Sequence, residues 1–155
     1  MGANLGDRLA TLRSSVDALV ERGVIVEAVS PIYETAPREV ENQPPFLNAA
    51  CRIQTDLEPP ALLALIKGIE RDRGRVAGPR YGARAIDLDI LLWEGGEWSD
   101  PALVVPHPRL AERRFALVPV LDLDPDLVLD DEPLARAEAR LDRDEQPVSR
   151  YSGDG

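Results

Sequence analysis

The sequence predicts an α+β fold, namely a ferredoxin-like α/β sandwich in which helices pack on an antiparallel sheet. Three observations predict this fold. Segments of helical and strand periodicity follow each other in the order helix, strand, strand, helix, strand, which suits a sheet covered by helices on one side. The chain has 155 residues, enough for one domain with a sizeable core. Hydrophobic residues make up 44% of it, as is typical of a folded protein.

Two segments have the apolar spacing of amphipathic helices. Residues 7–22 carry leucine and valine at helical intervals, and Gly23 supplies a stop. Residues 59–73 begin with prolines, which suit the first turn of a helix, and Gly74 follows them. We therefore expect a helix in each segment, and a further short helix followed by a strand within residues 110–120.

Three segments are predicted strands. Residues 24–33 and 46–54 are rich in residues that favour strands, and a loop with three prolines over residues 35–45 separates them. Residues 86–93 run continuously apolar after Asp89, which predicts a strand buried on both faces. Residues 104–108, bracketed by prolines, are expected to be extended.

Two further predictions concern the ends of the chain. A ferredoxin-like unit needs one more strand before the first helix. Residues 2–7 resemble the turn that follows such a strand, and only Met1 precedes them, so we expect the first strand to be missing from this chain and to lie upstream. Residues from about 143 onward are expected to fray. We see no repeat or linker, so residues 1–155 are predicted to form a single domain.

Composition excludes several classes of protein. With 18 basic and 28 acidic residues, the net charge of −10 argues against general nucleic-acid binding, which usually requires a basic excess. No apolar run approaches the roughly 18 residues of a membrane helix, and no secretory leader is visible. The single cysteine, Cys51, excludes an internal disulfide and a cysteine-based zinc site. We expect a cytoplasmic protein that binds neither nucleic acid nor membranes.

Arginines gather in one part of this acidic chain. One acid, Asp72, lies among five arginines, which are Arg71, Arg73, Arg75, Arg80 and Arg84. Guanidinium groups bind phosphate through paired hydrogen bonds, so the cluster favours a small phosphorylated ligand. A solvated helix end with loop arginines would explain the same pattern.

Asp87 and Asp89 form the strongest local signal. Residues two apart on a strand point to the same face, so both carboxylates would lie close together and repel each other. Divalent cations relieve such repulsion, and hard oxygen ligands beside phosphates favour magnesium. The alternative is a pair of aspartates at a strand end that simply faces water.

Four other side chains are candidates for ligand contacts. His107, the only histidine, lies between two prolines and suits a phosphate contact, although a surface turn is an equal alternative. Phe46 and Phe115 are the only phenylalanines; they could stack on a flat ring, but core packing is the simpler explanation. Asn48 shares a strand face with Phe46, and its amide could read the edge of a heterocycle.

Seven segments together resemble the 6-hydroxymethyl-7,8-dihydropterin pyrophosphokinase family of folate biosynthesis. In order, they are GANLGD at 2–7, SPIYET at 30–35, QPPFLNAA at 43–50, IE with GRV at 69–76, RYGARAIDLDIL at 80–91, VPHP at 105–108 and RRF at 113–115. The stretch from Arg80 to Leu91 is the most specific of them. The resemblance covers residues 2 to about 128.

The resemblance implies an enzyme that transfers the pyrophosphoryl group of ATP to the hydroxymethyl group of the pterin and releases AMP. It implies two magnesium ions held by Asp87 and Asp89. The implied catalytic residues are Arg75, Arg84, Asp87 and Asp89. The implied ATP contacts are Glu70, Arg75, Arg84, Ile90, His107 and Arg113. The implied pterin contacts are Thr35, Pro37, Phe46, Asn48 and Phe115.

Two other classes of function stay open on the residues alone. A different two-metal nucleotidyl- or phosphotransferase would share the paired aspartates but not the set of Phe46, Asn48 and Phe115. A non-catalytic ligand-binding module would have no reason to place paired aspartates beside an arginine-rich loop. For the enzyme, we expect a monomer whose partners are its two small-molecule substrates.

Overall fold

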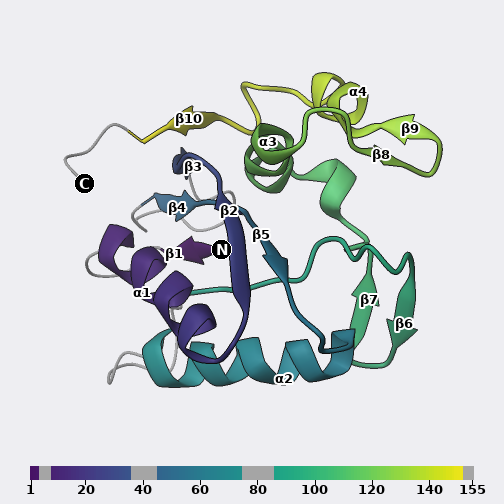
Figure 1. The fold of residues 1–155 in the computed structure, drawn as a ribbon. Coiled ribbons are helices and arrows are strands. Elements are labelled where there is room, and N and C mark those ends of the chain that lie inside the picture. Colours follow the sequence, from purple (N-terminus) through teal and green to yellow (C-terminus); the bar gives the residue numbers. More distant parts are fainter. Residues whose placement is uncertain (4–7, 36–44, 75–85, 152–155) are drawn as a thin grey trace.

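The computed structural model describes residues 1–3, 8–35, 45–74 and 86–151 (Figure 1). These residues form a mixed α+β structure with antiparallel sheets, as predicted. The α-helices of the described part are α1 (Arg8–Glu21), α2 (Pro59–Ile69), α3 (Arg114–Leu123) and α4 (Leu134–Ala139). None of them is long and apolar enough to cross a membrane.

The largest described sheet contains strands from both ends of the chain. Its order is β1 (Gly2–Ala3), β4 (Phe46–Asn48), β3 (Tyr33–Thr35) and β10 (Val148–Arg150), with antiparallel pairing throughout. Three more antiparallel pairs are β2 (Ile25–Val29) with β5 (Cys51–Gln54), β6 (Trp98–Asp100) with β7 (Leu103–Val105), and β8 (Val128–Leu129) with β9 (Glu132–Pro133). Gly2 and Ala3, expected in a turn, are thus a short strand.

Each of the two long predicted strands is broken into two, at places that face each other. β2 and β3 are separated at Ser30 and Pro31, and β4 and β5 are separated at Ala49 and Ala50. Pro31 has no backbone N–H to offer to a ladder. The neighbouring Ser30 pairs with Ala50 on the opposite strand: its Oγ accepts the N–H of Ala50 at 2.9 Å, and its own N–H donates to the Ala50 carbonyl at 2.8 Å. The ladder is therefore interrupted without leaving these backbone groups unpaired.

The main core lies between α1, α2 and the segment that starts at residue 86. Leu19, Ile66 and Ile69 from the two helices pack with Ile86 and Leu88, all of them buried. Burying a side chain of this size stabilises the fold by about 1.5–3 kcal/mol. Figure 1 shows α2 along one end of the molecule and α3 with α4 at the other, with β2 and β5 running between them.

The expectation of a continuous strand over residues 86–93 is wrong. Asp87 forms an isolated antiparallel bridge with Gly2, in which each backbone N–H donates to the other residue's carbonyl, at 2.9 and 2.8 Å. The Leu88 N–H points to the edge opposite Gly2, and there it donates to the Glu70 side chain instead of a neighbouring strand. Residues 88–93 are consequently outside any regular strand.

Two expectations about the C-terminal third also need correction. Residues 110–120 hold no strand: a 3₁₀ turn at Leu110–Glu112 leads directly into α3, because Leu110 and Leu117 bury their side chains against Leu134 of α4. The chain does not fray uniformly from residue 143, since β10 pairs with β3. A strand partner more than a hundred residues away supplies the order that the local sequence does not indicate.

Candidate functional site

The strand residues expected at the pterin site lie together on one face of the sheet. Thr35 pairs directly with Phe46 across β3 and β4, and Asn48 follows two residues after Phe46. Directly opposed residues, and residues two apart, point to the same face. Asn48 and Thr35 are buried, and the Asn48 Nδ2 donates to Thr35 Oγ1 at 2.8 Å. The amide plane of Asn48 is therefore held in a fixed orientation.

Gly2 packs closely against this amide from the neighbouring strand. A Cβ atom at position 2 would lie 2.8 Å from Asn48 Oδ1, which is shorter than any normal contact. Glycine is required here because only hydrogen occupies that space. The first glycine of the chain thus helps to fix the Asn48 side chain.

Helix α3 contributes the other aromatic residue at its first turn. Phe115 is half-buried, and the Arg113 guanidinium carbon lies 5.5 Å from the centre of its ring. That separation is within the range of a cation–π contact. Among the described residues, the close ring pair is Trp93 with Trp98, so Phe46 and Phe115 do not stack on each other. Two rings that hold a ligand between them cannot stack on each other.

Asp87 and Asp89 point away from the core. Ile86 and Leu88 are buried, whereas Asp87 is half-buried and Asp89 is exposed. This alternation places both carboxylates on the side opposite the apolar side chains. Burial lowers the pKa of the Met1 amino group, and the nearby Cys51, Asp89 and Asp87 partly offset that effect. Both carboxylates therefore lie close enough to the Met1 amino group to influence its pKa.

The donors at this position fit magnesium. Two carboxylates on one face are hard oxygen ligands, and magnesium typically binds through one or two carboxylates together with substrate phosphates and water. Among the described residues, no group of three or more His, Cys, Asp or Glu side chains could hold a metal ion. An arrangement of only two carboxylates matches a metal that substrate phosphates help to bind, rather than a closed structural site.

Glu70 connects helix α2 to the aspartates. It begins a π-helical turn, Glu70–Gly74, at the end of α2. Its Oε2 accepts the backbone N–H of Leu88 at 2.8 Å, and its Oε1 pairs with Lys67 Nζ at 2.9 Å. The carboxylate thus fixes the backbone between Asp87 and Asp89, in addition to any contact that it makes with a ligand.

An open cleft of about 280 Å³ lies beside Asp89. Its walls come from α2, from residues 88–90, from the β6–β7 hairpin and from the segment that follows it. Ile90 and His107, both expected as nucleotide contacts, line this cleft together with Asp89 and Lys67. The structure therefore places two expected ATP contacts and one expected metal ligand in the same cleft.

His107 is held by its own backbone. Its N–H donates to the Leu91 carbonyl at 2.9 Å, and its Nδ1 accepts the N–H of Arg109 at 3.2 Å. The neutral ring consequently carries its proton on Nε2. Burial lowers the pKa of His107; Asp89 raises it, and the charges of Arg113 and Arg109 lower it. The side chain is therefore biased toward the neutral form, a hydrogen-bond donor.

Three expected site residues lie outside the described part of the chain. They are Pro37, Arg75 and Arg84. Their roles remain predictions from the resemblance.

Comparison with known proteins decides the family. The model of the 7,8-dihydro-6-hydroxymethylpterin-pyrophosphokinase family matches residues 1–125. The chain belongs to this family. It is therefore a member of the pyrophosphokinases of folate biosynthesis, as the sequence motifs predicted.

Named relatives agree with this membership in the pyrophosphokinase family. The chain is 43% identical over 143 residues to the 2-amino-4-hydroxy-6-hydroxymethyldihydropteridine pyrophosphokinase of Methylorubrum extorquens, covering 92% of this chain and 90% of that protein. It is 44% identical over 124 residues to the enzyme of the same name from Bacillus subtilis, covering 79% and 74%. It is also 46% identical over 123 residues to the mitochondrial folate synthesis bifunctional protein of Arabidopsis thaliana. That match covers 79% of this chain but 22% of the plant protein, so the chain spans less than a quarter of this larger relative.

Sequence reasoning did not identify one wall of the cleft, the β6–β7 hairpin. Asp100 and Leu103 of this hairpin line the cleft. The hairpin holds its shape because the Asp100 carboxylate accepts the Trp98 indole N–H at 2.6 Å and two backbone N–H groups of the turn.

Proposed function

We propose that this chain transfers the pyrophosphoryl group of ATP to the hydroxymethyl group of 6-hydroxymethyl-7,8-dihydropterin. In this reaction the hydroxymethyl oxygen forms a bond to the β-phosphorus of ATP. The bond between that phosphorus and the α,β-bridging oxygen breaks, and AMP leaves. The hydroxyl proton is lost as the pterin diphosphate forms.

The observation that supports this proposal most directly is the position of Asp89 in the cleft that Ile90 and His107 line, with Asp87 two residues before it. We propose that this cleft takes the nucleotide, with the apolar Ile90 against the base and the Nε2–H of His107 directed to a phosphate. Arg113 and the arginines at 75 and 84 would complete the phosphate contacts, since guanidinium groups match phosphate geometry. Preorganised cations stabilise the charge that develops during phosphoryl transfer.

Asp87 and Asp89 would hold two magnesium ions. When bound, these ions would neutralise phosphate charge and lower the pKa of the attacking hydroxyl. Asp89 is the more exposed of the two and lines the cleft, so it also suits acceptance of the hydroxyl proton. Pterin would lie between Phe46 and Phe115, with Asn48 and the backbone around Thr35 and Pro37 at its edge.

We propose the ferredoxin-like arrangement for the domain as a whole, and a monomer as the active form. The antiparallel order β1-β4-β3-β10 with helices packed on the strands supports the first of these. A monomer suffices because every proposed contact comes from one chain.

One assay tests the proposed reaction. AMP is measured from ATP with and without the hydroxymethyl pterin, each in the presence and absence of magnesium. We expect AMP only when pterin and magnesium are both present. AMP formation that does not depend on pterin would indicate a different two-metal transferase, and magnesium-independent binding without turnover would indicate a non-catalytic module.

A further inference from the structure

A short segment near the C-terminus contacts two of the structural elements that carry the proposed pterin contacts, strand β3 and helix α3. We call residues 142–150 the strap. Its first part lies against the start of α3, which carries Arg113 and Phe115, and its last part is β10, which pairs with β3. The strap lies outside residues 1–125, the part that the family model matches.

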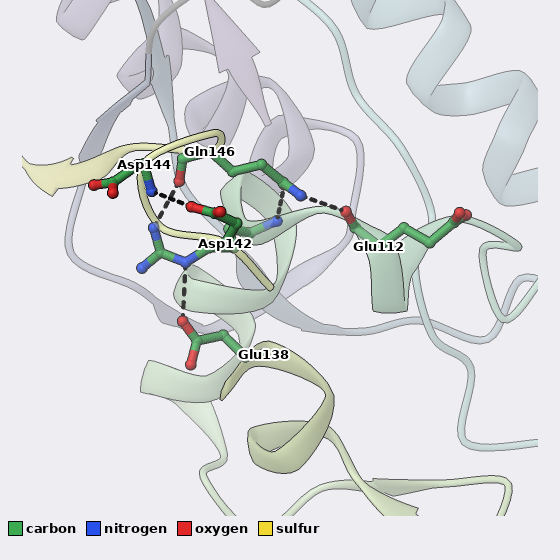
Figure 2. A network of polar contacts seen from close by, with 6 residues as sticks. Glu112, Glu138, Asp142, Asp144 and Gln146 are labelled. Carbon is green, nitrogen blue, oxygen red and sulfur yellow. Dashed lines mark hydrogen bonds and ion pairs between the residues drawn. The ribbon is translucent and has the colours of Figure 1, made fainter. Parts of the chain in front are cut away.

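The first part of the strap caps α3. The first backbone N–H groups of any helix have no acceptor within the helix. In α3, the side chain of the N-cap residue Arg113 does not supply such an acceptor. Gln146, 32 residues away in sequence, supplies it instead: its Oε1 accepts the Arg114 N–H at 2.9 Å. Its Nε2 donates to the Glu112 carbonyl at 3.1 Å (Figure 2). One amide side chain thus holds the backbone on both sides of Arg113.

Gln146 is itself held in place. The buried Arg114 guanidinium donates from Nη1 to the Gln146 carbonyl at 2.6 Å and from Nε to Glu138 Oε1 at 3.0 Å. The Asp142 carboxylate accepts the N–H groups of Asp144 and Glu145, which closes the turn that precedes Gln146. Figure 2 shows these groups converging on the start of α3. A buried guanidinium with two hydrogen bonds, one of them to a carboxylate, holds this arrangement in place.

The last part of the strap extends the sheet beside the pterin strands. Val148 pairs with Thr35 and Arg150 pairs with Tyr33. Tyr33 in turn donates its hydroxyl to Asp122 of α3. Two residues after Gln146, the same chain segment therefore reaches the strand that carries Thr35.

We propose that the strap sets the separation between the β3–β4 wall and the α3 wall of the pterin site, with Gln146 as its positioning residue. This inference rests on the proposed function. Gln146 would not touch the substrate; it acts through Phe115, whose ring position depends on the first turn of α3. A small displacement of one wall would widen a site that must contact both faces of a flat ring.

The test uses the full chain with Gln146→Met, which keeps the length of the side chain and removes both hydrogen bonds. We expect the pterin KM to rise about fivefold to tenfold. A change of this size corresponds to the net free energy of roughly one hydrogen bond. We expect kcat at saturating pterin to stay within about twofold of the parent. Gln146→Glu keeps an acceptor for the Arg114 N–H and should restore part of the affinity.

Two controls separate positioning from general stability. Ala18→Gly removes a methyl group from the core on α1 and should lower the melting temperature without changing the pterin KM. Arg140→Ala breaks an exposed bidentate ion pair with Glu132 in the same C-terminal region and should lower the melting temperature slightly without changing the pterin KM.

A double-mutant cycle gives the decisive measurement. If Gln146 acts through Phe115, the effect of Gln146→Met on the pterin KM disappears in a Phe115→Ala background. Additive effects, or an unchanged KM in Gln146→Met below its melting temperature, would overturn the positioning role while leaving the proposed function intact. A parent chain that forms no AMP from ATP and pterin would overturn the proposed function, and the role of the strap with it.

Discussion

The backbone N–H of Leu88 donates to the Glu70 carboxylate at 2.8 Å. This bond joins the end of helix α2 to the segment that starts at residue 86. It uses the Leu88 N–H on the edge opposite the Gly2–Asp87 bridge, and it sets the backbone between the two proposed metal ligands. The Glu70 side chain is only 11% exposed, so water cannot readily replace it. A carboxylate expected to touch nucleotide is thus also a positioning group.

Glu70→Ala should therefore reduce both stability and turnover. An N–H left without its partner in a mostly buried place costs about 1–3 kcal/mol. For a domain of this size we expect a fall in melting temperature of roughly 2–10 °C. Glu70→Gln keeps an oxygen acceptor for Leu88 and should retain more of both properties. Glu27→Ala, which removes a loose exposed ion pair with Arg52, is the control; equal losses in the three variants would contradict this role.

Local patterns sufficed for much of the fold. The leucine spacing before Gly23 and the prolines at residues 59 and 60 predict α1 and α2, because helical periodicity and capping are local properties. The paired aspartates could be identified because the Asp-x-Asp pattern involves only two neighbouring positions in the sequence. The two long strands were found, but their breaks depend on how Ser30, next to Pro31, pairs with Ala50 across the sheet.

The structural features that the sequence did not predict depend on contacts with residues far away in the chain. An apolar run such as residues 86–93 predicts burial, but it does not say whether a neighbouring backbone is available to pair with. Here the Leu88 N–H goes to a side chain. β10 was missed because its partner, β3, lies more than a hundred residues earlier. Gln146 was missed for the same reason, since a cap supplied from 32 residues away leaves no local signal.

Asp87→Asn and Asp89→Asn should each abolish magnesium-dependent turnover. Removing one of the two negative oxygen ligands proposed for the metal costs several kcal/mol of transition-state stabilisation. The melting temperature should stay near that of the parent, since neither carboxylate packs in the core. Turnover of the parent should stop on chelation and return with added magnesium. Asp126→Asn, exposed and remote, is the matched control; near-normal rates in both site variants at saturating magnesium would refute the assignment.

Phe46→Ala and Phe115→Ala should raise the pterin KM more than they lower stability. Both rings are half-buried, and a stacked ring contributes about 0.5–1.5 kcal/mol beyond its buried area. Leu117→Ala, two residues further along α3 at a fully buried position, should show the opposite pattern. Its expected cost is about 2–5 kcal/mol of unfolding free energy. Calorimetric titration with pterin beside thermal melts separates the two; unchanged pterin affinity with a large stability loss would make the phenylalanines core residues.

The single histidine offers a direct test of electrostatics in the proposed nucleotide cleft. Burial lowers the pKa of His107, so the folded chain binds this proton less tightly than the unfolded chain does. Between the folded pKa and the unfolded value of about 6.5, the unfolded state therefore carries more protons, and stability falls as the pH falls through this window. Above about pH 6.5 the contribution is fully present.

His107→Gln should remove this dependence on pH, because glutamine does not titrate while it keeps a hydrogen-bond donor. The ring pKa is measured by NMR on the metal-free chain, where one histidine gives one set of signals. Unfolding free energies of parent and variant are then compared from about pH 7 down to 5, which spans the titration range of an ordinary histidine. A ring pKa at or above the unfolded value, or identical pH profiles for the two chains, would show that burial does not control the charge of this side chain.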